Sequence, residues 1–310
     1  MMDQTEQFGE PEYLGWSLLT RLKDQSNDQI SRSKFLKLCC ITDRYLLEKC
    51  DYDVGLPRYW YMYGELANQH EFSGRFFNAP KAIGWDGQQY LPKSNITFED
   101  FDISIEARET IDSGVEWTVS EFGRNNVEEI KQHQHRENAP HEFIQLYSEL
   151  RWQLKTIDLS TQQRLGNYTE EAQSNEEFLR QHLDRMLETY PNEDFEEMRS
   201  LFLRWDDTIR LMLDQSPDFG EIEECLDDFI RVLSKVVPRF EYSRNISEQR
   251  LSDWRSDSAT VKERFERELR EKRRDRLLDR DRTPHAGYEA ISDVFSETVR
   301  NDSEGLSLEE

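Results

Sequence analysis

The sequence predicts a mainly α-helical protein, with an N-terminal helical domain that carries a small β-hairpin and with a C-terminal helical bundle. Three observations support this class. Apolar residues recur at steps of three and four along most of the 310-residue chain. Asp86-Gly87 separates two short hydrophobic runs, which is typical of a hairpin turn. The chain also contains 17 Phe, 12 Tyr and 7 Trp, which supply bulky side chains for packed cores.

The first half is predicted to form one domain, residues 13–157, behind a mobile tail at residues 1–12. Helical spacing recurs in this half over 13–22, 30–50, 103–122, 127–135 and 143–154. The aromatic segment 56–72 is interrupted by Gly64, which suggests a short helix broken by a tight turn. Because Asp-Gly tolerates the positive φ angles of a type I′ turn, we expect the small hairpin between residues 74 and 92.

Residues 158–175 are polar and weakly periodic, so they are predicted to be a linker. The C-terminal helical region should follow over 176–300, opened by a capping box that pairs Ser174 with Glu177. Residues 301–310 are predicted to be a disordered tail. Apolar seams repeat in this region at Phe195, Met198, Phe202, Trp205, Ile209 and Met212, and again at Ile222, Cys225, Leu226, Phe229, Leu233 and Val236. Seams of this kind pack against partner helices.

A long charged helix is predicted from residue 251 to 282. Over 262–282 it carries ten basic and seven acidic residues. One interpretation is a solvated helix whose own charges pair at i,i+4; the other is an arm that contacts an acidic partner or nucleic acid. Mixed signs favour the solvated helix, because such runs usually face water.

The charge balance is strongly acidic, with 64 acidic against 40 basic residues and a net charge of -24. A surface of this kind indicates a halophilic protein, because carboxylates keep a protein hydrated where salt screens ordinary repulsion. An ordinary acidic mesophilic protein is the alternative. The acidity disfavours nucleic acid as a partner, since phosphate binding depends on clustered Lys and Arg.

The N-terminal sequence and the lack of a long apolar stretch favour a cytoplasmic protein. No positive segment followed by an apolar run opens the chain, and no stretch is apolar enough to predict a membrane span. The four cysteines form no C-x-x-C pair and are predicted to be buried thiols.

The usual catalytic signatures are missing from the sequence, so we predict no enzyme activity and no cofactor. Nucleophile-elbow, phosphate-loop, dinucleotide-binding and zinc-ligand spacings do not occur. The alternative is a metal-dependent hydrolase that uses His133, His135 and His141, because imidazole is the commonest metal ligand. Residues two apart on a helix diverge, however, so His133 and His135 would converge only on extended backbone. Otherwise these histidines serve to cap a helix end.

Three ordered elements of the first half resemble the Panacea antitoxin domain, a helical module of toxin–antitoxin and mobile-element loci. The residues that carry the resemblance are Leu36, Lys37, Leu38, Ile41, Tyr45 and Leu46, then Tyr63 and Gly64, then Ile130, His135, Glu137 and Pro140. Glu65 stands where the family usually has Pro, and Gln134 where it usually has Thr.

The resemblance implies a protein-binding module that neutralises a protein partner such as a toxin, without catalysis. It also implies that Tyr63 and His135 are structural residues that hold a turn and a helix end together. A winged-helix-like alternative places residues 85–88 at the tip of a wing, which would make the protein a transcriptional regulator. The acidic surroundings argue against DNA binding by that wing.

Overall fold

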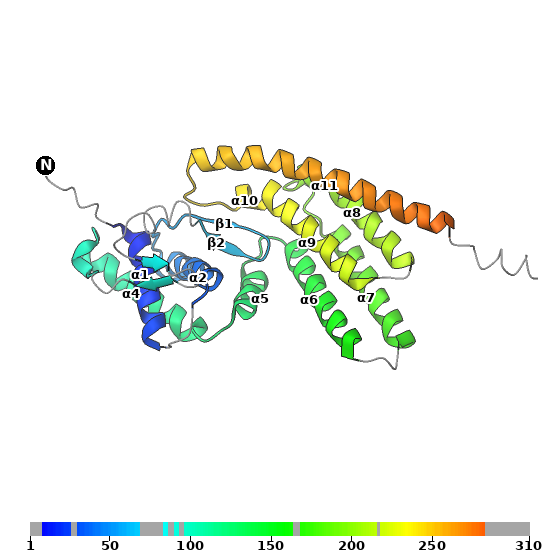
Figure 1. Cartoon of the computed structure of the whole chain (residues 1–310). Helices are drawn as coiled ribbons and strands as arrows, with labels where there is room; N and C mark the ends of the chain where they lie inside the picture. The colour runs from blue at the N-terminus through cyan, green and yellow to red at the C-terminus, as the bar shows by residue number, and fades with distance from the viewer. Residues whose placement is uncertain are drawn as a thin grey trace, which may run out of the picture.

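The computed structural model describes residues 8–25, 30–68, 83–85, 90–92, 96–163, 168–215 and 218–282, and within them it confirms the mainly α class. The molecule is elongated, with the earlier helices at one end and the later helices at the other (Figure 1). In chain order the elements are α1 (Glu10–Gln25), α2 (Arg32–Cys50), β1 (Arg58–Trp60), β2 (Glu65–Ala67), β3 (Ile83–Trp85), β4 (Tyr90–Pro92), the 3-10 helix η1 (Phe98–Asp100), α4 (Ile105–Phe122), α5 (Val127–Asn138), α6 (Glu142–Gln163), α7 (Tyr168–Glu188), α8 (Glu196–Asp214), α9 (Phe219–Val236), α10 (Pro238–Glu241) and α11 (Glu248–Arg282).

The N-terminal core is built where α1 and α2 pack against α4. Its helices approach closely, because a Cβ added to Gly114 on α4 would come within 2.6 Å of Leu46 Cδ2 on α2. Nearby, Tyr45 stacks on Trp117 with ring centroids 4.1 Å apart. Gly114 therefore permits α2 and α4 to cross closely, and the Tyr45–Trp117 pair packs beside this crossing.

The predicted N-terminal tail is wrong for residues 8–12. Phe8 is buried, its ring lies 5.6 Å from that of Phe101, and its carbonyl oxygen accepts a hydrogen bond of 2.8 Å from the Asp102 amide. Helix α1 begins directly afterwards, at Glu10. Residues 1–7 and the predicted tail at 301–310 lie outside the described residues.

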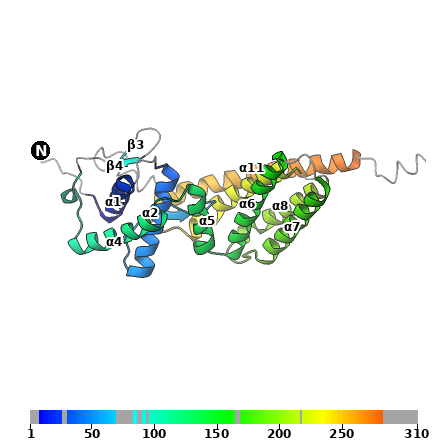
Figure 2. The same cartoon turned by 90° about the horizontal axis from the view of Figure 1, so that it is seen from below.

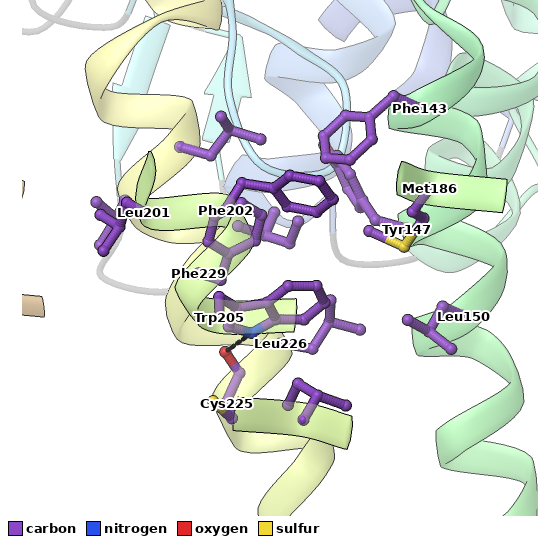
Figure 3. Close-up of a cluster of buried hydrophobic side chains, with 14 of the residues drawn as sticks. Phe143, Tyr147, Leu150, Met186, Leu201, Phe202, Trp205, Cys225, Leu226 and Phe229 are labelled. Atoms are coloured by element: carbon purple, nitrogen blue, oxygen red, sulfur yellow. Dashed lines mark hydrogen bonds between the residues drawn. The ribbon is translucent and has the colours of Figure 1, made fainter. Parts of the chain in front are cut away.

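The C-terminal core follows the predicted seams. Trp205 on α8 and Phe229 on α9 are completely or almost completely buried, and their rings stack with centroids 4.7 Å apart. The Trp205 indole donates a hydrogen bond of 3.1 Å to the Cys225 carbonyl oxygen (Figure 3). From the opposite side, Phe143 and Tyr147 of α6 complete the same cluster. The indole therefore keeps its polar atom paired while its ring fills the bundle.

Helix α11 confirms the predicted charged helix and packs along α8 and α9 (Figure 2). Phe265 and Leu269 are buried against the bundle, while the charges lie outside. Some of those charges pair across helices: Lys262 lies 3.3 Å from Glu197, and Arg273 lies 3.4 Å from Asp207. An apolar stripe thus fixes this helix, and the exposed ion pairs add little.

The predicted linker at residues 158–175 is mostly helical, because α6 extends to Gln163 and α7 begins at Tyr168. Ser174 therefore lies inside α7 and does not open it. Apart from Trp60, which packs in the C-terminal cluster, the change from one hydrophobic cluster to the other falls between Ile130 and Phe143. Helix α6, predicted within the first domain, contributes its apolar face to the C-terminal core.

The predicted hairpin is present as β3 and β4, which pair antiparallel with Trp85 opposite Tyr90. Its turn, residues 86–89, lies outside the described residues, as does most of the proposed wing tip. The described part of segment 56–72 forms a second hairpin, in which β1 pairs antiparallel with β2. The short helix predicted there is wrong, because alternate side chains of these strands are buried on one face.

The stacked rings at the centre of the bundle predict a large effect of truncation. Phe229→Ala should lower the free energy of unfolding by about 3–5 kcal/mol, because it leaves a cavity among rings that cannot close up. Leu203→Ala is the control, since Leu203 is 41% exposed on α8, and its effect should stay within about 0.5 kcal/mol. Urea unfolding followed by circular dichroism measures both; equal effects of the two variants would contradict the packing described here.

Candidate functional site

The β1–β2 hairpin, residues 58–67, lies at the junction of the two halves, and we call it the junction hairpin. At its tip the Tyr61 amide donates a hydrogen bond of 3.1 Å to the Gly64 carbonyl oxygen. Met62 and Gly64 have φ angles of 43° and 111°. A Cβ at Gly64 would overlap the side chain of Gln134 on α5. Glycine is therefore required at this position by both the backbone angle and the close approach of α5.

Lys37 on α2 is buried beneath this tip, with 2% of its surface exposed. Its Nζ donates a hydrogen bond of 2.7 Å to the Tyr63 carbonyl oxygen and one of 2.8 Å to Gln134 Oε1. Burial lowers the pKa of Lys37 to about 7. This amine therefore connects three elements, namely α2, the junction hairpin and α5.

A second buried group of charges lies beside Lys37. Arg58 donates from Nε to Asp43 Oδ2 at 2.7 Å and from its guanidinium to Glu65, and Arg44 donates from Nε to Glu65 Oε2 at 3.1 Å. Burial alone would lower the pKa of Arg58, but the carboxylates of Glu65 and Asp43 outweigh it and raise that pKa. Burial raises the pKa of Asp43, although Arg58 opposes this shift. The Glu65 carboxylate is thus paired with two guanidinium groups, those of Arg58 and Arg44.

The tip of the junction hairpin also bonds to the C-terminal half. The Tyr63 hydroxyl donates to Asp227 Oδ1 on α9 at 2.6 Å, and Arg151 on α6 donates to both oxygens of the same carboxylate, at 2.7 and 3.2 Å. The Arg151 guanidinium lies 4.3 Å from the centre of the Tyr63 ring. At Met62, the carbonyl oxygen accepts from the Tyr147 hydroxyl at 2.6 Å. These bonds join the junction hairpin to α6 and α9.

His135 is buried against the same hairpin. Its ring centroid lies 5.5 Å from Trp60, 6.2 Å from Tyr63 and 5.8 Å from Tyr147. Burial, reinforced by the nearby Lys37 ammonium, lowers the pKa of His135 to about 3. The imidazole is therefore neutral at pH 7 and acts as one ring in an aromatic cluster.

The structure does not bring the three histidines of the proposed metal site together. His133 packs on Phe122, with ring centroids 4.6 Å apart, whereas His135 faces the junction hairpin. The Nε2 atom of His141 lies 2.6 Å from the Tyr242 hydroxyl and 3.2 Å from Asp194 Oδ2. Among the described residues, no group of His, Cys, Asp and Glu has the arrangement of a metal site. The three histidines therefore do not supply the convergent ligands on which the hydrolase alternative relied.

The residues of the Panacea-like elements occupy different environments. Leu38 and Ile130 lie in the N-terminal core, and Tyr45 of α2 stacks on Trp117 of α4. Tyr63 and Gly64 lie at the tip of the junction hairpin, and the His135 ring lies 6.2 Å from that of Tyr63. Glu137 is exposed and pairs with Arg136 at 2.7 Å, while Pro140 is partly buried between α5 and α6.

Several residues of the junction were not singled out as site residues from the sequence. They are Asp43, Arg58, Arg151 and Asp227, together with the buried amine of Lys37. A lysine on the apolar face of α2 is a signal that sequence reasoning could have used, because buried lysines are rare and need partners. Arg151 and Asp227 carry no such signal, since α6 and α9 each present several charges.

A groove lies between α5, α6 and α7, next to His135, and we call it the bundle groove. Its volume is about 540 Å³, and its lining includes His135, Glu149, Trp152, Phe178 and His182. Trp152 is 53% exposed, whereas the Phe178 and His182 rings lie 4.2 Å apart. His182 Nε2 is 3.5 Å from Glu149 Oε2. The groove therefore combines an exposed indole with a ring pair and several polar side chains.

Comparisons with protein-family models, with curated proteins and with solved structures found no match for this chain. The Panacea resemblance therefore rests on the residues quoted above and on their order. Among the helices of the described ranges, none combines the length and the apolar character needed to cross a membrane.

The lowered pKa of Lys37 predicts a pH-dependent stability. Between about pH 7 and 10 the folded chain releases the Lys37 proton while the unfolded chain retains it, so the free energy of unfolding rises with pH. Relative to Lys37→Met, the native protein should gain about 3 kcal/mol between pH 6.5 and 9.5. Urea unfolding at several pH values measures this gain. Lys49→Met, at an exposed position of α2, is the control; parallel profiles for all three proteins would contradict the prediction.

The bond between Tyr63 and Asp227 predicts energetic coupling across the junction. In a double-mutant cycle, Tyr63→Phe and Asp227→Asn should couple by about 1–2 kcal/mol in the free energy of unfolding, because a charge-assisted hydrogen bond joins them. Tyr242→Phe is the matched control, since its hydroxyl contacts His141 instead, and its effect should add to that of Asp227→Asn. If the effects are additive in both cycles, the hydrogen bond between Tyr63 and Asp227 does not contribute to the free energy of unfolding.

Proposed function

We propose that the protein is a non-catalytic, antitoxin-like binding module that holds a basic protein partner in the bundle groove. The observation that carries the proposal is the exposure of Trp152 beside the Phe178–His182 ring pair. Tryptophan is enriched among the residues that dominate binding energy, because a partner can desolvate its large ring. At about 540 Å³ the groove has room for side chains of a partner.

Charge supports the choice of a basic partner. The chain has a net charge of -24, whereas the charges that line the groove, those of Arg136 and Glu149, are opposite in sign and balance each other. A nearly neutral groove within a strongly acidic protein can bind apolar side chains while the surrounding field attracts positive charge. The order of the Panacea-like elements supports the antitoxin-like role in particular.

The lowered pKa of His135 supports a binding role over a catalytic one. It lines the bundle groove, but its pKa of about 3 lies far below the pH at which a general base works best. A protein surface that binds through shape and aromatic contact needs no such base. The low pKa of His135 therefore supports the binding role that we propose for the groove.

The test uses the product of the gene adjacent to the one for this chain. Co-expressed, the two proteins should co-elute in size-exclusion chromatography, and the chain should restore growth if its neighbour is toxic. Trp152→Ala should weaken the complex at least tenfold, because it removes the exposed ring from the groove. Isothermal titration calorimetry at physiological salt measures the affinity.

Leu203→Ala provides the matched control, because Leu203 is also exposed but lies on α8, outside the groove lining. It should leave the affinity unchanged. The proposal fails if the neighbour neither binds nor has its toxicity relieved, or if Trp152→Ala and Leu203→Ala bind equally well.

A further inference from the structure

A second opening, the aromatic cleft, lies on a different part of the junction hairpin. It has a volume of about 590 Å³ and is lined by Tyr59 and Tyr61 of the hairpin region, Arg32 at the start of α2, Lys235 of α9, Arg239 of α10 and Trp254 of α11. Helix α10 packs on β1, which brings these distant segments together (Figure 1). The cleft has a volume typical of small-molecule sites.

Arg239 gives the cleft a buried cation. Only 4% of the residue is exposed, and one terminal nitrogen donates to the Trp254 carbonyl oxygen at 2.7 Å. Both terminal nitrogens lie 3.5 Å from Asp257 Oδ2, at the limit of a hydrogen bond. The Nε atom has no hydrogen-bond partner among the described residues. A buried guanidinium with an unused donor is costly by itself, and an anion in the cleft would stabilise its positive charge.

The charges around Arg239 favour an anion in this place. Arg32, Lys235 and Arg239 line the cleft together with a single carboxylate, that of Asp257, from which Lys235 Nζ is 3.2 Å away. The cleft is thus locally positive in a chain whose net charge is -24. The first residues of α2, Arg32 and Ser33, also lie in the lining, so the positive end of that helix dipole adds to the attraction.

Aromatic rings form the remaining wall of the cleft. The Tyr59 ring lies 4.8 Å from that of Trp254 and 6.2 Å from that of Tyr61. All three side chains are partly exposed, so their ring surfaces are accessible to a ligand. Rings of this kind stack on flat heteroaromatic groups with little regard to their exact identity.

We propose that the aromatic cleft binds a small anionic ligand that carries a flat ring, of the mononucleotide class. Its phosphate group lies against Arg239 and Lys235, and its ring lies on the wall formed by Tyr59, Tyr61 and Trp254. This site is separate from the bundle groove, because the two linings share no residue. A ligand site in the aromatic cleft would add small-molecule binding to the protein binding proposed for the bundle groove.

The test is calorimetric titration of the full-length protein with AMP, with inorganic phosphate and with adenosine. AMP should bind at least tenfold more tightly than phosphate or adenosine, because it uses both parts of the cleft. Lys235→Gln should weaken the binding of AMP and of phosphate about tenfold, through the loss of one charge-assisted contact. Tyr61→Leu should weaken the binding of AMP about tenfold and leave that of phosphate unchanged.

Lys262→Gln is the matched control, because the side chain of Lys262 is 27% exposed and pairs with Glu197 of α8, while that of Lys235 is 25% exposed and pairs with Asp257. It should leave AMP binding unchanged, and so should Trp152→Ala, which tests the bundle groove separately. The proposal is overturned if AMP does not bind at millimolar concentration, or if Lys235→Gln binds it as the control does. If AMP and phosphate bind equally tightly and Tyr61→Leu does not change the affinity for AMP, the proposed stacking of the ligand ring on the aromatic wall is wrong.

Discussion

The pairing of buried charges on α2 with the junction hairpin is the constraint on which the rest of the structure depends. Lys37, Asp43 and Arg58 lie where water cannot reach them, and a buried charge without a partner would cost several kcal/mol. Hydrogen bonds to the hairpin and to α5 meet this requirement. They fix the hairpin in a single position relative to the N-terminal helices, because each bond has a demanding geometry.

Once the junction hairpin is fixed, the positions of the candidate sites follow. Its tip extends to α6 and α9, where Tyr63, Asp227 and Arg151 form their shared contact. One side of the hairpin contributes Tyr59 and Tyr61 to the aromatic cleft, while Trp60 packs on His135, which borders the bundle groove. Both openings therefore depend on the same short pair of strands, although they differ in charge and in chemistry.

The sequence predicts the helical part of this fold well, because apolar seams such as the one through Phe202 and Trp205 report directly which face of a helix is buried. It predicts the junction poorly. The strands β1 and β2 have three residues each, too few for a reliable alternating pattern, and Arg58 and Glu65 are buried although charged residues usually face solvent.

The segment 158–175 shows the opposite difficulty. Its weak periodicity suggested a linker, but a helix can continue through residues with no strong apolar stripe when their intrinsic preference is helical. For the candidate site, Tyr63, Gly64 and His135 were identified from their order along the chain. The partners of Tyr63 on α6 and α9, Arg151 and Asp227, reach it through tertiary contacts between distant segments, which a local pattern cannot reveal.

Trp60 lies on a strand that links the two hydrophobic clusters, and this position limits where the chain can be cut into separate fragments. Trp60 is part of the hydrophobic cluster of the later helices, whereas Ala67, on the paired strand, belongs to that of the earlier ones. A fragment ending near residue 140 would thus expose this indole to water, and the Met62 amide and carbonyl would lose their partners, the Ser234 and Tyr147 hydroxyls. The N-terminal portion that resembles an antitoxin domain therefore depends on the later helices for part of its packing and hydrogen bonding.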